Sequence, residues 1–181
     1  MPHITLNNKL PGIAALLKDF PETAKPMLEL AQILLRGDST LSEGERELIA
    51  TYVSSRNGCD YCQYTHGATA KHLLDASYDF IDRVKDDDAD SELSPKMKSL
   101  LTIAGEVQQS GKNVSEDDIN RAKENGATDR EIHDTVLIAA TFCMFNRYVD
   151  GLATVKPDDE SIYDERGALL AEKGYGWQTD G

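Results

Sequence analysis

Two of the chain's three cysteines lie close together, in a stretch that also contains a histidine and a glutamate. Cys59 and Cys62 form a Cys-x-x-Cys pair, His66 follows the second cysteine by four residues, and Glu47 precedes the first by twelve. A thiolate is the nucleophilic form of cysteine, histidine exchanges protons near neutral pH, and a carboxylate can orient an imidazole. The spacing therefore indicates a redox centre, a metal site or an ordinary piece of helix.

A single helix is expected to carry both cysteines, because residues 57–58, Asn-Gly, form a helix break just before them. The new helix begins at or just before Cys59. In that helix Cys59, Cys62 and His66 occupy positions i, i+3 and i+7, which lie on one face. The unpaired N–H groups and the positive end of the dipole favour thiolate in the first turn, whereas the charge of Asp60 opposes it.

The reduction of a peroxide needs the parts that this stretch contains. A thiolate attacks one peroxide oxygen, the departing alkoxide or hydroxide needs a proton, and the sulfenic acid that forms needs a second thiol. His66 lies one turn beyond Cys62 and can exchange a proton with it directly or through a water, while Glu47 can hold the tautomer of the imidazole. Cys59 and Cys62 are close enough to form a disulfide, which an outside thiol must then reopen.

The full pattern resembles a known family. The motif Glu-x11-Cys-x2-Cys-x3-His, set in "ELIA" and "NGCDYCQYTH", is similar to that of the AhpD family of alkyl hydroperoxidases, within the carboxymuconolactone decarboxylase superfamily. The later stretches "LSPKMKSLLTIAGEV", "VSEDDI" and "GATDREIHDTVLIAATFCMFNRYVDGL" resemble the branch of peroxidase-related proteins. The resemblance covers roughly residues 10–155.

The resemblance implies an all-helical, obligately oligomeric protein that reduces hydroperoxides through the cysteine pair. By the same carry-over, Cys62 is the peroxidatic thiol, Cys59 the resolving thiol, and Glu47 with His66 the proton relay. We expect no cofactor and no bound metal, and the expected partners are a hydroperoxide and a thiol reductant, either a protein or a small thiol. The best-known peroxidases carry a histidine just before the second cysteine, whereas this chain has Tyr61. Because tyrosine has a pKa of about 10, the relay would depend on the other two residues alone.

A metal site, simple packing or haem attachment fits the cysteine pair less well. Two thiolates and an imidazole are good zinc ligands, but a closed zinc site needs a fourth. His72 points elsewhere on the helix, and Glu47 would be a weaker oxygen ligand. The two cysteines could also be small buried residues that only pack. Haem attachment requires a histidine directly after the second cysteine, and this chain has Gln63 there.

Two further classes of function stay open. One is a lyase that acts as carboxymuconolactone decarboxylase does. That branch of the superfamily works without a cysteine pair, and the chain shows no cluster of Lys or Arg for a dicarboxylate. The other is a redox-sensing or metal-binding protein that does not turn over a substrate.

The elements that position these residues are expected to be helices throughout. No stretch alternates apolar and polar residues cleanly, so strands are not predicted. The pattern of starts and stops predicts an all-α protein of about seven helices. Expected starts are the capping boxes Ser42/Glu45, Ser115/Asp118 and Thr128/Glu131, the pair Ser94-Pro95, and the prolines Pro11 and Pro21. Pro26 is expected to mark the true start of the second helix or a kink in it.

Length and composition indicate the number of domains, the partners and the compartment of the protein. The 181 residues predict one domain, 1–181, with a polar C-terminal tail at 156–181 and a solvated acidic loop at 86–92. A net charge of −13 without any basic run argues against nucleic acid, and no apolar run is long enough for a membrane span. The N-terminus lacks a secretory pattern and the cysteine count is odd, so a reducing cytoplasm is expected.

Several other residues are expected to be structural. Cys143 lies in an apolar stretch and is predicted to be a packed, inert thiol. Tyr52, Phe142 and Phe145 are expected in the core, although each could line an apolar substrate pocket. Asn146 is expected to make hydrogen bonds near the end of its helix.

Overall fold

The computed structural model describes residues 1–87 and 92–176, and these residues form nine α-helices and no strand. The all-α fold class is therefore confirmed. The helices are α1 (Gly12–Asp19), α2 (Pro21–Arg36), α3 (Glu43–Arg56), α4 (Asp60–Leu74), α5 (Tyr78–Lys85), α6 (Pro95–Gln109), α7 (Glu116–Glu124), α8 (Asp129–Gly151) and α9 (Glu160–Lys173). None of them is both long and apolar enough to cross a membrane. Most of the predicted acidic loop, residues 88–91, lies outside the described residues.

The described residues contain two helices more than the seven expected, and α5 and α9 account for the difference. α5 has only eight residues, too few for a clear period. α9 lies within the segment 156–181 that is predicted to be a polar tail, and it buries only Tyr163, Gly167 and Leu170. Because this apolar stripe is sparse, the periodic signal for α9 is weak.

The expected helix starts are mostly confirmed. All three capping boxes form, with N-caps Ser42, Ser115 and Thr128 and carboxylates that return to the N-cap backbone. α6 begins directly after its N-cap Ser94. α2 begins at Pro21, so the expectation that Pro26 is the true start is wrong, and Pro26 lies inside the helix instead.

α3 is the central helix of the fold, because it packs against α2, α4, α5, α6 and α8. All of its residues from Arg46 to Ser54 are buried. A helix that is surrounded in this way has no polar face, and its apolar residues join the main core. Its buried polar residues must therefore find partners inside the protein, and Glu47 is one of them.

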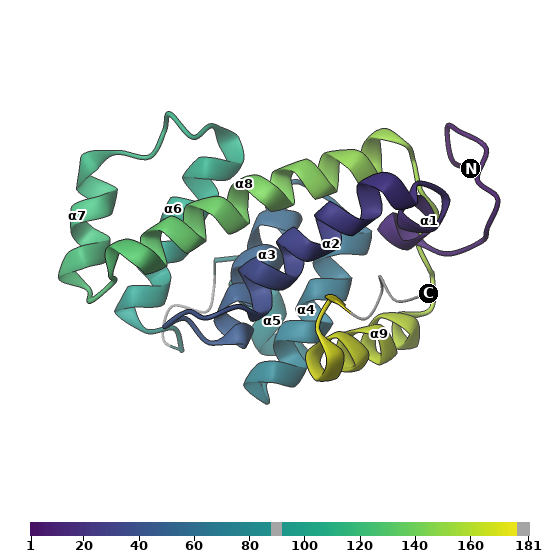
Figure 1. Cartoon of the computed structure of the whole chain (residues 1–181). Helices are drawn as coiled ribbons and strands as arrows, with labels where there is room; N and C mark the ends of the chain where they lie inside the picture. The colour runs from purple at the N-terminus through teal and green to yellow at the C-terminus, as the bar shows by residue number, and fades with distance from the viewer. Residues whose placement is uncertain (88–91, 177–181) are drawn as a thin grey trace.

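The other helices surround α3. Figure 1 shows the long α8 crossing the molecule, with α6 and α7 near one end and α1 near the other. α2 contacts both α3 and α8, and α9 packs along α4. Helices α2, α3, α4, α8 and α9 each contribute side chains to the region around the cysteine pair.

α9 touches α4 almost backbone to backbone at Gly167. A Cβ atom at this position would lie 2.6 Å from the Cβ of Ala68 and 2.7 Å from its carbonyl carbon. Any larger residue must therefore push the two helices apart. This close contact fixes the position of the segment that follows α9.

We expect Gly167→Ala to lower the free energy of unfolding by about 1–3 kcal/mol, the usual cost of overpacking. Gly105→Ala is the matched control, because a Cβ there would meet only the Tyr52 ring at an ordinary 3.4 Å. The control should leave stability unchanged or raise it by up to about 1 kcal/mol. Urea unfolding measures both, and equal stability of the two variants would contradict the close helix contact.

Candidate functional site

The cysteine pair lies at the start of α4, where the sequence pattern predicts a new helix. Gly58, with φ of 70°, ends the turn from α3, and Cys59 is the N-cap of α4. Cys59 is fully buried and Cys62 is 4% exposed. Both are free thiols, and their Sγ atoms lie 2.8 Å apart. The pair therefore needs only a small movement to form a disulfide, whose S–S bond is about 2.05 Å.

The two thiols are not equivalent. The Cys59 thiol donates a hydrogen bond to the Sγ atom of Cys62. This hydrogen bond, together with burial, raises the pKa of Cys59. The positive end of the helix dipole, which is expected to favour a thiolate in the first turn, therefore does not do so at Cys59. Cys59 keeps its proton and points it at the Sγ atom of Cys62, which acts as the acceptor.

His66 lies one turn beyond Cys62 and is held by Glu47. The Nδ1 atom of His66 is 2.7 Å from the Oε2 atom of Glu47, which is fully buried on α3. An ionised carboxylate can only accept, so Nδ1 carries the hydrogen and Nε2 is the nitrogen available for proton exchange. The edge of this imidazole also packs against Phe142, with the ring centroids 4.6 Å apart.

Glu47 is held by two further donors that do not belong to the predicted motif. Arg36 Nη2 and the Tyr175 hydroxyl each lie 2.7 Å from Glu47 Oε1. Burial alone raises the pKa of Glu47, but His66, Arg36 and the Tyr175 hydroxyl outweigh that effect and lower it. The structure thus keeps an ionised carboxylate in its interior.

Tyr175 reaches this carboxylate from the C-terminal segment. Gly174 has φ of 65° and turns the chain after α9. The Oε1 atom of Gln32 then accepts hydrogen bonds from the backbone N–H groups of Tyr175 and Gly176, at 2.6 and 3.1 Å. Burial and the charge of Glu47 raise the pKa of Tyr175 well above its ordinary value, so the hydroxyl stays protonated and donates. The only sequence signal is a glycine followed by an aromatic residue.

A cavity of about 50 Å³ opens between these groups. Its polar lining is formed by Tyr61, Cys62, Thr65, His66, Arg166 and Tyr175, and Cys59 is not part of the lining. The apolar wall comes from Ile13, Leu17, Met27, Leu28, Ala31, Phe142, Phe145 and Leu170. A cavity of this volume has room for only a few water molecules, so it accommodates a small group such as the O–O end of a peroxide.

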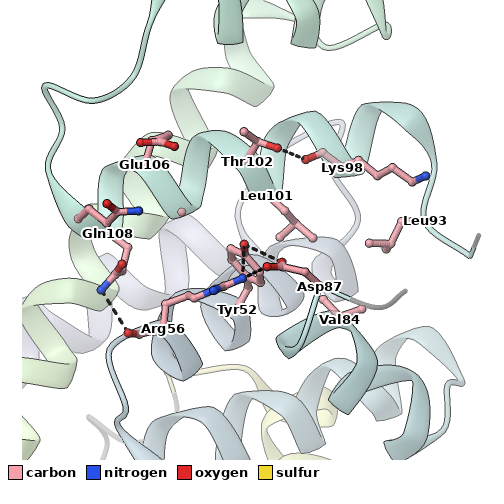
Figure 2. A pocket seen from close by; sticks show the side chains of 12 residues that line it. Tyr52, Arg56, Val84, Asp87, Leu93, Lys98, Leu101, Thr102, Glu106 and Gln108 are labelled. Carbon is pink, nitrogen blue, oxygen red and sulfur yellow. Dashed lines mark hydrogen bonds and ion pairs between the residues drawn. The ribbon is translucent and has the colours of Figure 1, made fainter. Parts of the chain in front are cut away.

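Other candidate residues lie elsewhere. Tyr52 lines a different hollow of about 440 Å³, where Figure 2 shows its hydroxyl with Arg56 and Asp87. Asn146 is buried and makes the expected structural hydrogen bonds, since its side chain bonds to those of Asn57 and Ser54. Cys143 is only partly buried, and its Sγ atom lies 3.5 Å from Asn57 Nδ2.

The structure also shows where the candidate metal ligands lie. His72 faces Asp164, with Nε2 and Oδ1 3.0 Å apart, and does not approach the cysteine pair. In the part of the chain that the structure describes, no three His, Cys, Asp or Glu side chains are grouped to hold a metal ion.

Tyr61, which stands where the best-known peroxidases carry a histidine, packs its ring near that of Tyr163 and against Gly12.

The model of the carboxymuconolactone decarboxylase family matches residues 21–74 and 75–157 of this sequence. The chain belongs to this family. The matched region contains Arg36, Glu47, both cysteines and His66. It ends before α9, so Tyr175 is contributed by a segment beyond the family match.

Two solved structures share the fold over most of the chain. An uncharacterized peroxidase-related protein from Silicibacter sp. TM1040 is 26% identical, with a TM-score of 0.74 over 84% of this chain and 80% of its own. An uncharacterized peroxidase-related protein from Ralstonia eutropha JMP134, described as an alkylhydroperoxidase AhpD core, is 25% identical, with a TM-score of 0.77 over 88% and 82%. No curated protein matches the chain. The protein is therefore an AhpD-like, peroxidase-related member of the carboxymuconolactone decarboxylase family.

We expect Tyr175→Phe to lower the free energy of unfolding by about 1.5–3 kcal/mol, because it removes a hydrogen bond to a buried charged group. Tyr163→Phe is the matched control on the same C-terminal segment, since its hydroxyl donates only to the neutral carbonyl of Pro157. The control should cost about 1 kcal/mol. Urea unfolding measures both values, and a smaller loss for Tyr175→Phe than for Tyr163→Phe would contradict this network.

Proposed function

We propose that this family member is a thiol-dependent peroxidase that reduces alkyl or hydrogen peroxides through Cys62 and Cys59. One observation carries the proposal: Cys62 accepts a hydrogen bond from a second thiol and lines the same cavity as His66, whose other nitrogen is held by ionised Glu47. A nucleophile, a proton carrier and a resolving thiol are thus within one site. The likeness to peroxidase-related structures supports the same reaction class.

In the first step the Cys62 proton passes to Nε2 of His66, and the thiolate attacks one oxygen of the peroxide. The O–O bond breaks, a sulfenic acid forms on Cys62, and the leaving alkoxide or hydroxide takes the proton back from His66. Glu47 stabilises the positive imidazolium that exists between these two proton transfers. Arg36 and Tyr175 hold Glu47 in place while this happens.

In the second step Cys59 closes the cycle. Its sulfur attacks the sulfenic sulfur of Cys62, a disulfide forms, and water leaves with the Cys59 proton. Two electrons from an outside thiol reductant, a protein or a small thiol, then restore both thiols. The raised pKa of Cys59 suits this order, because Cys59 stays protonated until the sulfenic acid has formed.

The wider setting of this reaction is part of the proposal. The disulfide must be reopened, so the protein should work in a reducing compartment such as the cytoplasm. We also propose a single domain of residues 1–181 that assembles as a homo-oligomer. An apolar strip on α8 supports assembly, because Leu137 and Met144 are exposed and lie two helical turns apart.

The reaction is tested by mixing reduced protein with a slight excess of hydrogen peroxide and following free thiols and intact mass. We expect rapid loss of two thiols and of two mass units in the wild type. Cys62→Ser should abolish this loss, and His66→Ala should slow it by about 10²-fold or more, as expected when a proton carrier is removed. Thiols that stay unreactive in the wild type would contradict the proposal and direct attention to lyase activity.

The cavity sets the size of the preferred peroxide. We expect Met27→Ala, which removes part of the wall, to raise the rate with cumene hydroperoxide several-fold relative to the rate with hydrogen peroxide. Ile33→Ala is the control, because Ile33 lies on the same helix but is 65% exposed. Stopped-flow measurement of thiol oxidation gives the ratio of the two rates. An unchanged ratio in Met27→Ala would show that the peroxide binds elsewhere.

A further inference from the structure

Thr65 has a buried hydroxyl group without a partner. The side chain lies in the middle of α4 and is only 4% exposed. Its Oγ1 atom has no hydrogen-bond partner within residues 1–87 and 92–176. Burial of an unpaired hydroxyl is unfavourable, so it requires a physical reason.

Other helix threonines show what Thr65 could do instead. Thr51, Thr69, Thr102 and Thr135 each donate to the carbonyl oxygen four residues earlier, at 2.8–3.0 Å. This bond is available to a threonine in any regular helix. Thr69 makes it one turn further along the same α4, whereas Thr65 leaves the corresponding carbonyl of Tyr61 without this donor.

The position of Thr65 accounts for the difference. Thr65 lines the cavity together with Cys62, three residues before it, and His66, directly after it. Burial raises the pKa of Tyr61, and an interaction of its hydroxyl with that of Thr65 offsets part of that rise. The two hydroxyls thus lie close together at this wall, but Thr65 Oγ1 is outside hydrogen-bonding geometry with any partner among the described residues. The unpaired donor therefore lies beside the thiol that is proposed to attack the peroxide.

We propose that Thr65 is a catalytic residue whose hydroxyl donates a hydrogen bond to the peroxide oxygen that Cys62 attacks. This inference rests on the proposed peroxidase function. Thr65 transfers no proton: the thiol proton still passes through His66 to the leaving oxygen. The hydrogen bond from Thr65 orients the O–O bond against the sulfur and stabilises the charge that moves onto the oxygens as the bond breaks.

The test compares Thr65→Val, which keeps the shape of the side chain, with Thr65→Ser, which keeps the hydroxyl. The control Thr69→Val removes a hydroxyl that is already paired within the helix. Each variant is mixed with hydrogen peroxide, and the rate of Cys62 oxidation is measured. The rate of Cys62 alkylation by iodoacetamide is measured in parallel, because it needs the thiolate but no peroxide. The thermal midpoint of each variant is recorded.

Thr65→Val should oxidise about tenfold more slowly than wild type, the loss expected for one hydrogen bond in the transition state. Its alkylation rate should stay within about twofold of wild type, and Thr65→Ser should restore most of the oxidation rate, because it returns the donor. Thr69→Val should oxidise at the wild-type rate. The thermal midpoint should not fall in Thr65→Val, because no protein hydrogen bond is lost, but should fall in Thr69→Val.

The outcomes separate the two proposals. If wild type oxidises rapidly and Thr65→Val matches it, the role of Thr65 is wrong and the peroxidase function stands. If Thr65→Val slows oxidation and alkylation equally, Thr65 acts on the thiol and not on the peroxide, and the inference is again wrong. If wild-type Cys62 alkylates readily but does not react with peroxide, the peroxidase function fails, and the role of Thr65 fails with it.

Discussion

The buried carboxylate of Glu47 is the constraint on which the rest of the site depends. An ionised group without solvent is strongly unfavourable unless donors surround it, and removal of one partner of a buried pair is usually more costly than the net gain from the pair. Three donors meet at Glu47: Arg36 from α2, His66 from α4 and Tyr175 from the segment after α9. One side chain of the central helix thus fixes the relative positions of three other elements.

The contacts of Glu47 also determine which atom of the imidazole faces the cavity. Because Glu47 engages Nδ1 of His66, the other imidazole nitrogen is left for the cavity. Because Cys59 is the N-cap of α4 and donates to Cys62, the two thiols have different surroundings although they lie three residues apart. α3 thus carries an ionised side chain within its buried stretch, residues 46–54, and donors from other elements surround that side chain.

The sequence predicts the local part of this site well and the distant part poorly. The helix break at residues 57–58 folds α4 back along α3, so Glu47 and His66 meet through one turn, and their spacing is visible in the motif. The helices and their capping boxes can be predicted for the same reason, because each depends on residues within one or two turns of the chain. Arg36 and Tyr175 lie 11 and 128 residues from Glu47, and no short pattern connects them. Tyr175 is also hard to find because α9, which positions it, buries few apolar residues.

We propose that Cys62 attacks the peroxide and that Cys59 resolves the product. The most direct test uses Cys59→Ser, in which the sulfenic acid cannot be resolved and can be trapped. The variant is mixed with hydrogen peroxide in the presence of dimedone, digested, and mapped by mass spectrometry. We expect the adduct to lie on Cys62. The absence of an adduct on Cys62, or an adduct only on Cys143, would contradict it.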